Sequence, residues 1–106
     1  MAWTLLFIAG LLEVAWATAM KRSEGFTLLV PTAVTIVTML LSVWLLSIAM
    51  RTLPLGTAYT VWTGIGAVGA FVVGVWVLGE AATPLRLVAA ALIVAGIALM
   101  RLSGAE

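Results

Sequence analysis

The first membrane-length stretch of the chain decides its fold: residues 2–20 read AWTLLFIAGLLEVAWATAM. A helix needs roughly 20 mostly apolar residues to cross a hydrocarbon core of about 30 Å, and this stretch meets that requirement. The stretch begins without a positive region, which favours a retained span over a cleaved leader. Its one charge, Glu13, lies near mid-membrane, where ionisable groups normally face the protein interior and have a function.

Charged and turn-forming residues divide the rest of the 106-residue chain into three more apolar runs, at 27–50, 57–78 and 85–102. Only 8% of the residues are charged and the mean hydropathy is +1.31, which is too apolar for the exterior of a soluble domain. Short connections make consecutive helices antiparallel neighbours. We expect an all-α, multi-pass membrane protein with a single transmembrane domain over residues 1–106.

The residue types that are missing exclude several classes of function. The chain has no cysteine and no histidine, which removes thiol chemistry, the usual general base and the commonest metal ligands. A net charge of +1 leaves no basic stripe to neutralise the phosphates of nucleic acid. We therefore expect no enzyme, no metal, no cofactor and no nucleic-acid partner.

Glu13 has no charged partner in the interior of the other runs. A carboxylate in that position must bind a proton, bind an external cation, or face a second copy of itself. If a proton and a cation compete for one site, loading either displaces the other, and this competition is the minimal requirement for exchange. The alternative is a neutral, hydrogen-bonded glutamic acid that holds helices together in a structural subunit.

Helical spacing places Gly10 and Trp16 on the same face as Glu13, at i−3 and i+3. Ser42 is the mid-membrane hydroxyl of the second run, and it has two interpretations. It either lines the site and orients the carboxylate, or it bonds back to its own helix, as serines in helices often do.

The third run carries a similar stripe formed by Tyr59, Trp62 and Gly66. The sequence supports two functions for Tyr59 and Trp62 about equally: contact with a ligand, or packing between helices. Gly66 belongs to a four-residue spacing of small residues that allows close helix packing, and Gly64 makes the run locally bendable.

Basic residues give no clear membrane orientation. One side carries Arg51 and Arg101, and the other carries Lys21, Arg22 and Arg86. This small bias indicates either a weak signal in a short sequence or insertion in both orientations.

Four helices of this length enclose little room for a guest and its pathway. A homodimer provides that room and brings two Glu13 side chains into one cavity, where they titrate as a coupled pair. Opposed subunits would also form an inverted repeat, the symmetry that transporters use for alternating access.

Three segments carry a resemblance to a known family: AGLLEVAWA at 9–17, KRSEGFT at 21–27 and TLPLGTAYTVWTGIG at 52–66. The chain resembles the small multidrug resistance family from end to end. Trp16 and the Trp-Thr-Gly-Ile-Gly segment look like its guanidinium exporter subtype. The exporters of quaternary ammonium compounds more often carry a small residue at the position of Trp16, and Trp-Ser-Gly-Val-Gly in the third span.

The resemblance implies an antiparallel, dual-topology homodimer in the bacterial inner membrane that exchanges protons for guanidinium. It further implies that Glu13 binds both ions and that Trp16, Ser42, Tyr59 and Trp62 line the site. The residues leave open whether small substituted guanidinium ions are also carried. The alternatives are a broader exporter of quaternary ammonium and other drug cations, and a membrane subunit that transports nothing.

Overall fold

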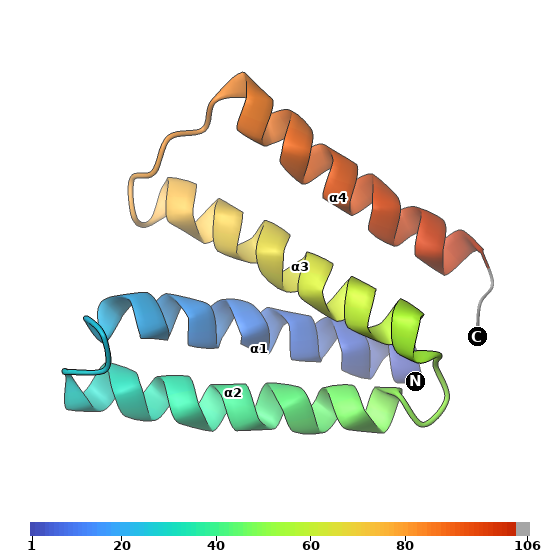
Figure 1. The fold of residues 1–106 in the computed structure, drawn as a ribbon, viewed down its shortest axis with the longest axis horizontal. Helices are drawn as coiled ribbons and strands as arrows, with labels where there is room; N and C mark the ends of the chain where they lie inside the picture. Colours follow the sequence, from blue (N-terminus) through green and yellow to red (C-terminus); the bar gives the residue numbers. More distant parts are fainter. Residues whose placement is uncertain (104–106) are drawn as a thin grey trace.

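The computed structural model describes residues 1–103, which form four helices (Figure 1): α1 (Ala2–Arg22), α2 (Leu29–Ala49), α3 (Leu55–Trp76) and α4 (Pro84–Leu102). Each helix is long and apolar enough to cross a membrane. For this part of the chain, the expected all-α fold with four span-length helices is confirmed.

The turn between α1 and α2 shows why α2 begins at Leu29 rather than at residue 27. The backbone N–H groups of Thr27 and Leu28 donate to the carbonyl of Ser23, at 2.9 and 3.1 Å. These bonds form a turn and not the first turn of a helix. The Ser23 side chain is fully buried, and its hydroxyl donates to the Met20 carbonyl at 2.7 Å, which closes the end of α1.

The starts of α3 and α4 follow ordinary capping rules. Extended backbone at Pro54 lets α3 begin at Leu55. Proline at the first position of α4 is compatible with a helix because its missing N–H would have no helical partner there. The Thr83 side chain caps α4 by accepting a hydrogen bond from the backbone N–H of Arg86 at 3.2 Å.

The helices form a flat layer. The molecule measures 42 × 34 × 17 Å, and one helix with its side chains is about 10–12 Å across. In Figure 1, α1 lies between α2 and α3, and α4 lies outside α3. The expectation that consecutive helices are neighbours is therefore wrong for α2 and α3 in this layer, because the segment between them passes the end of α1. No described residue of α4 is buried. A layer this thin leaves broad apolar faces without a protein partner.

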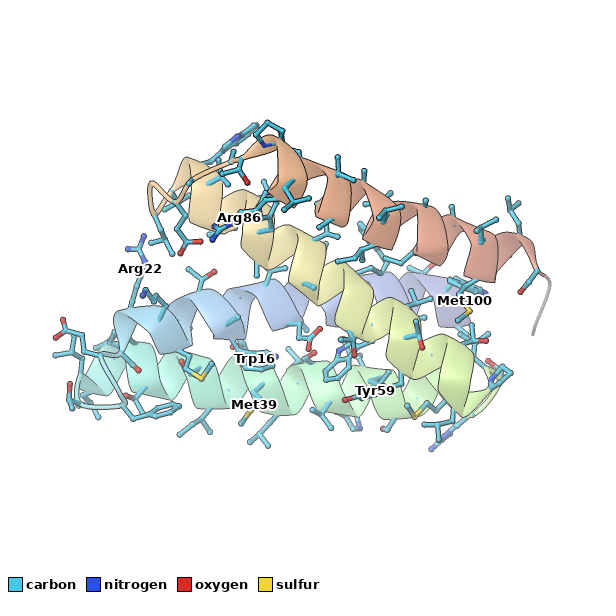
Figure 2. The ribbon with its side chains drawn as sticks, turned by 45° about the horizontal axis from the view of Figure 1, so that its top comes forward. Trp16, Arg22, Met39, Tyr59, Arg86 and Met100 are labelled. Carbon is cyan, nitrogen blue, oxygen red and sulfur yellow. The ribbon has the colours of Figure 1, made fainter. Side chains whose placement is uncertain are left out.

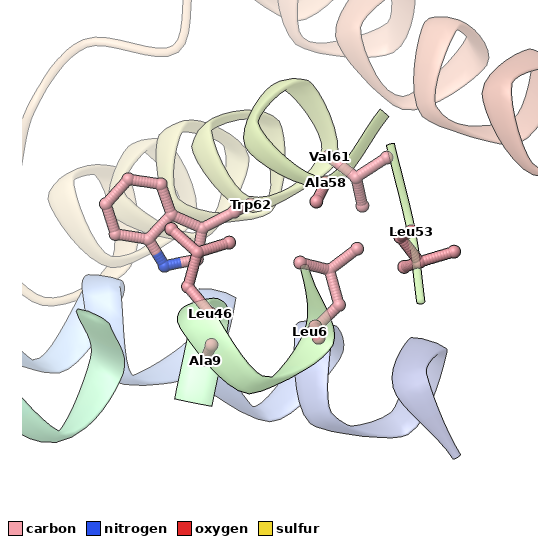
Figure 3. Close-up of a cluster of buried hydrophobic side chains, with 8 residues drawn as sticks. Leu6, Ala9, Leu46, Leu53, Ala58, Val61 and Trp62 are labelled. Carbon is pink, nitrogen blue, oxygen red and sulfur yellow. The ribbon is translucent and has the colours of Figure 1, made fainter. Parts of the chain in front are cut away.

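The buried core lies where α1, α2 and α3 meet, at the end of the layer that holds the N-terminus (Figures 1 and 3). The Trp62 ring extends into this cluster from α3 (Figure 3). Glu13 follows the core residue Ala9 by one turn of α1, so the acidic side chain lies next to the buried core. The core consists of Leu6, Ala9, Leu46, Ala49, Leu53, Ala58, Val61 and Trp62.

Glycines allow α3 to approach both of its neighbours. A Cβ atom added at Gly10 of α1 would lie 2.6 Å from Cγ2 of Ile65. A Cβ added at Gly64 would lie 2.8 Å from Cδ1 of Ile97 in α4. Because real Cβ contacts are longer than this and Cβ of Ile65 is also only 2.7 Å away, the close α1–α3 approach depends on Gly10, whereas the flexible end of Ile97 could move aside for a side chain at Gly64.

We predict that Gly10→Ala lowers the free energy of unfolding in detergent by about 1–3 kcal/mol, because the new methyl group overpacks the contact with Ile65. Gly96→Ala is the matched control, since a Cβ at Gly96 meets no atom within 4 Å. The control gains only helix propensity, up to about 1 kcal/mol. Equal unfolding free energies for the two variants would contradict this account of the α1–α3 contact.

Candidate cation-binding site

The Glu13 carboxyl group faces α3, and one of its oxygens lacks a hydrogen bond in the described chain. The side chain is half-buried, and its Oε1 atom is buried with no hydrogen-bond partner within residues 1–103. A Cβ atom at Gly66 would overlap Oε1 and would lie 2.7 Å from Cδ of Glu13. The absent side chain of Gly66 is therefore what makes room for the carboxyl group.

Glu13 lines a pocket of about 230 Å³ between α1 and α3. Trp16 lies beside it on α1, and its indole Nε1 is also buried without a hydrogen-bond partner in the described chain. Figure 2 shows Trp16 extending from α1 and Tyr59 extending from α3. The pocket thus brings together an acidic residue and an aromatic residue of the same helix. Its lining residues are Glu13, Trp16, Ala17, Thr63, Gly66, Ala67 and Ala70.

Ser42 joins three helices beside this pocket. Its buried hydroxyl donates to the Ala9 carbonyl of α1 at 2.7 Å, and it accepts from the Trp62 indole N–H of α3 at 3.0 Å. The serine therefore bonds across helices and not back to its own helix. The hydrogen of its hydroxyl goes to Ala9, so Ser42 fixes the orientation of Trp62 and gives no hydrogen to Glu13.

Tyr59 lies two turns before Gly66 on α3 and lines a different pocket. Its ring packs against that of Trp62, with the centroids 5.7 Å apart and the planes at 44°. It lines a pocket of about 470 Å³ between α3 and α4 and not the pocket of Glu13. Within one chain, Glu13 and Trp16 share a pocket, whereas Trp62 belongs to the core and Tyr59 to the outer groove.

Sequence reasoning missed Thr63, which lines the Glu13 pocket from α3. The signal was present, because Thr63 stands three residues before Gly66 and so shares its helix face. The structure also gives Gly64 and Gly66 different neighbours: Gly64 faces α4, and Gly66 faces Glu13.

Electrostatically, the site has one charge. Glu13 is the only acidic residue within α1 to α4, and their basic residues lie in first or last turns. In residues 1–103, no group of three or more acidic residues is placed to hold a metal ion. The pocket can therefore neutralise one monovalent cation or take up one proton per chain.

A family model, that of the Small Multidrug Resistance protein, matches residues 1–93. The chain belongs to the small multidrug resistance family. Glu13 and the α1–α3 pocket are thus features of a small multidrug resistance protein.

Individual relatives within the small multidrug resistance family are similar over nearly their whole length. The chain is 58% identical to a guanidinium exporter of Citrobacter freundii and to one of Salmonella typhimurium. It is 54% identical to a guanidinium exporter of Escherichia coli strain K12. Each match spans 103 residues, which is 97% of this chain and 98% of the relative.

We predict that Ser42→Ala lowers the free energy of unfolding by about 1–3 kcal/mol, because it leaves the buried Trp62 indole N–H without an acceptor. Trp62 fluorescence should also change as the ring loses its fixed orientation. Ser47→Ala is the control, since the exposed Ser47 hydroxyl donates only to the Trp44 carbonyl of its own helix. Similar unfolding curves for both variants would rule out the proposed function of Ser42 as a three-helix link.

Proposed function

We propose that this protein exports guanidinium from the bacterial cytoplasm in exchange for protons. The observation that carries the proposal is the Glu13 carboxyl group, buried beside Gly66 with one oxygen lacking a hydrogen-bond partner in the described chain. Membership of the small multidrug resistance family and high identity to guanidinium exporters support the choice of substrate. An exporter that moves guanidinium out of the bacterial cytoplasm would lie in the inner membrane.

The pocket suits a planar cation chemically. Guanidinium has N–H donors in a fixed fork that matches the two oxygens of a carboxylate, so Glu13 is able to pair with it through two parallel hydrogen bonds. The Trp16 ring lines the same pocket, and aromatic faces attract cations. Because Tyr59 and Trp62 do not line this pocket within one chain, they would join the aromatic wall only in the dimer proposed below, with Ser42 holding Trp62 in place.

Exchange follows from having a single acidic group. A proton and a guanidinium ion both neutralise the Glu13 carboxylate, and neither is able to occupy it while the other does. Each ion therefore weakens the binding of the other to the same extent. Protons entering down their gradient release guanidinium on the outside, and no cofactor is required.

The transporting unit in this proposal is an antiparallel homodimer. A layer 17 Å thick has no enclosed chamber across it, and α4 has no buried residue in the described chain. A second copy placed against the open face would provide the missing wall and a second Glu13. If the two copies insert in opposite orientations, they form the inverted repeat on which alternating access depends.

We predict that Glu13→Gln abolishes proton-driven guanidinium uptake into proteoliposomes, because a neutral amide neither pairs with the cation nor takes up the proton. Glu24→Gln, which changes an exposed loop carboxylate, should transport like the wild type. Because protons compete with substrate, lowering the pH on the loading side should raise the apparent KM for guanidinium. Robust transport of tetraphenylphosphonium but not of guanidinium would instead identify an exporter of larger drug cations.

We predict dual topology because the connecting segments give almost no charge bias. The side shared by the N-terminus and the Arg51 turn also holds Arg101, against Lys21, Arg22 and Arg86 on the other side. A single reactive cysteine added after residue 106 should be labelled from both sides of the membrane in comparable amounts. Labelling from one side only would exclude the antiparallel arrangement.

A further inference from the structure

A second carboxyl group, that of Glu80, lies against the side of α3 that faces α1. A Cβ atom added at Gly74 would overlap Oε1 of Glu80 and would lie 3.0 Å from its Cδ. Glu13 has the same relation to Gly66, two turns or about 12 Å earlier on α3. Both carboxyl groups thus occupy space that a glycine of α3 leaves open, Glu13 from within α1 and Glu80 from the segment that follows α3.

The turn after α3 directs Glu80 back onto the helix. Gly79 has a φ of +74°, which residues with a side chain rarely adopt, and the chain reverses there. The backbone N–H of Glu80 then donates to the Gly74 carbonyl at 2.9 Å. The Glu80 side chain therefore lies beside the last turns of α3 and does not extend away from them.

Glu80 lines a pocket of about 210 Å³ between α1 and α3 that also contains Lys21. This pocket shares Ala17 and Ala70 with the Glu13 pocket. We call the two pockets together the α1–α3 groove. Lys21 and Glu80 are exposed and lie where α1 and α3 end (Figure 1). The groove therefore leads from Glu13 towards one surface of the membrane.

The outer end of the α1–α3 groove has features that attract cations. Both helices end there, and the C-terminal end of a helix carries partial negative charge. The last turn of α1 has basic residues, whereas the last turn of α3 has none, and the Glu80 carboxylate adds to the negative potential. Within residues 1–103, this carboxylate forms no hydrogen bond or ion pair, not even with Lys21 in the same pocket. An external cation would stabilise it there.

We propose that Glu80 is an outer capture site, which attracts guanidinium to the α1–α3 groove before the cation moves past Ala70 to Glu13. Lys21 opposes this attraction. The inference rests on the proposed function, since it assumes that guanidinium binds at Glu13. A water-exposed carboxylate holds a small cation weakly, so Glu80 raises the rate of arrival and leaves the final binding to Glu13. In the antiparallel homodimer, each membrane surface would have one such entrance.

The test is Glu80→Gln, measured as initial guanidinium uptake into proteoliposomes at an ionic strength of about 0.01 M, where the Debye length is about 30 Å. We expect the KM to rise about two- to fivefold, which is the effect of one exposed charge. The maximum rate should stay unchanged because Glu13 is intact. In about 1 M salt, where the Debye length is about 3 Å, the KM values of the variant and the wild type should converge.

Lys21→Gln should lower the KM by a similar factor at low ionic strength, because it removes the cation that opposes capture. Two charge-matched controls lie at the same end of α1 but outside the α1–α3 groove. Glu24→Gln removes the same charge as Glu80→Gln, and Arg22→Gln removes the same charge as Lys21→Gln. Both controls should leave the KM nearly unchanged.

An unchanged KM in Glu80→Gln at low ionic strength would overturn the inference. An equal rise in Glu24→Gln would also overturn it, because the effect would then come from surface charge in general. A lower maximum rate with the KM unchanged would identify a structural function of Glu80 instead. If the wild type itself transports no guanidinium, the proposed function fails first, so the two failures are distinguishable.

Discussion

A carboxyl group in the middle of the bilayer must have its charge neutralised, and much of this protein is arranged around that requirement at Glu13. The helices offer it no basic residue at its depth, and one of its oxygens is buried without a partner in the described chain. In the absence of an internal counter-ion, the charge must be neutralised by an ion that binds reversibly. A proton and a small cation both meet that description, which is why we propose Glu13 as the site of exchange.

The surrounding packing keeps this costly group in one place. Gly66 leaves the volume that the carboxyl group fills, and Gly10 lets α1 lie close enough to α3 for the pocket to form. Ser42 ties the Trp62 ring to the backbone of α1 by two hydrogen bonds. The buried α1–α3 region would hold the cation under the proposed function, whereas α4, with no buried residue in the described chain, is available to contact lipid or a second copy.

The sequence predicts the fold well because the signal for a membrane helix is strong: about twenty apolar residues between charged turns. It also identifies Glu13, since an isolated charge at that depth has few structural explanations. It does not predict the cross-helix bonds of Ser42, because a serine in a helix has an equally good acceptor in its own backbone. Thr63 and the placement of Tyr59 depend on how α3 is rotated between its neighbours, and helical periodicity alone does not determine that rotation.

Proton release on substrate binding tests the central claim most directly, because it measures the competition at Glu13 without requiring transport. Purified protein in weakly buffered detergent solution is mixed with guanidinium while a pH-indicator dye reports released protons across a pH series. The account predicts that the wild type releases protons as guanidinium binds, most strongly where the free carboxyl group is protonated, and that Glu13→Gln releases none. Guanidinium binding by the wild type without proton release at any pH would contradict it.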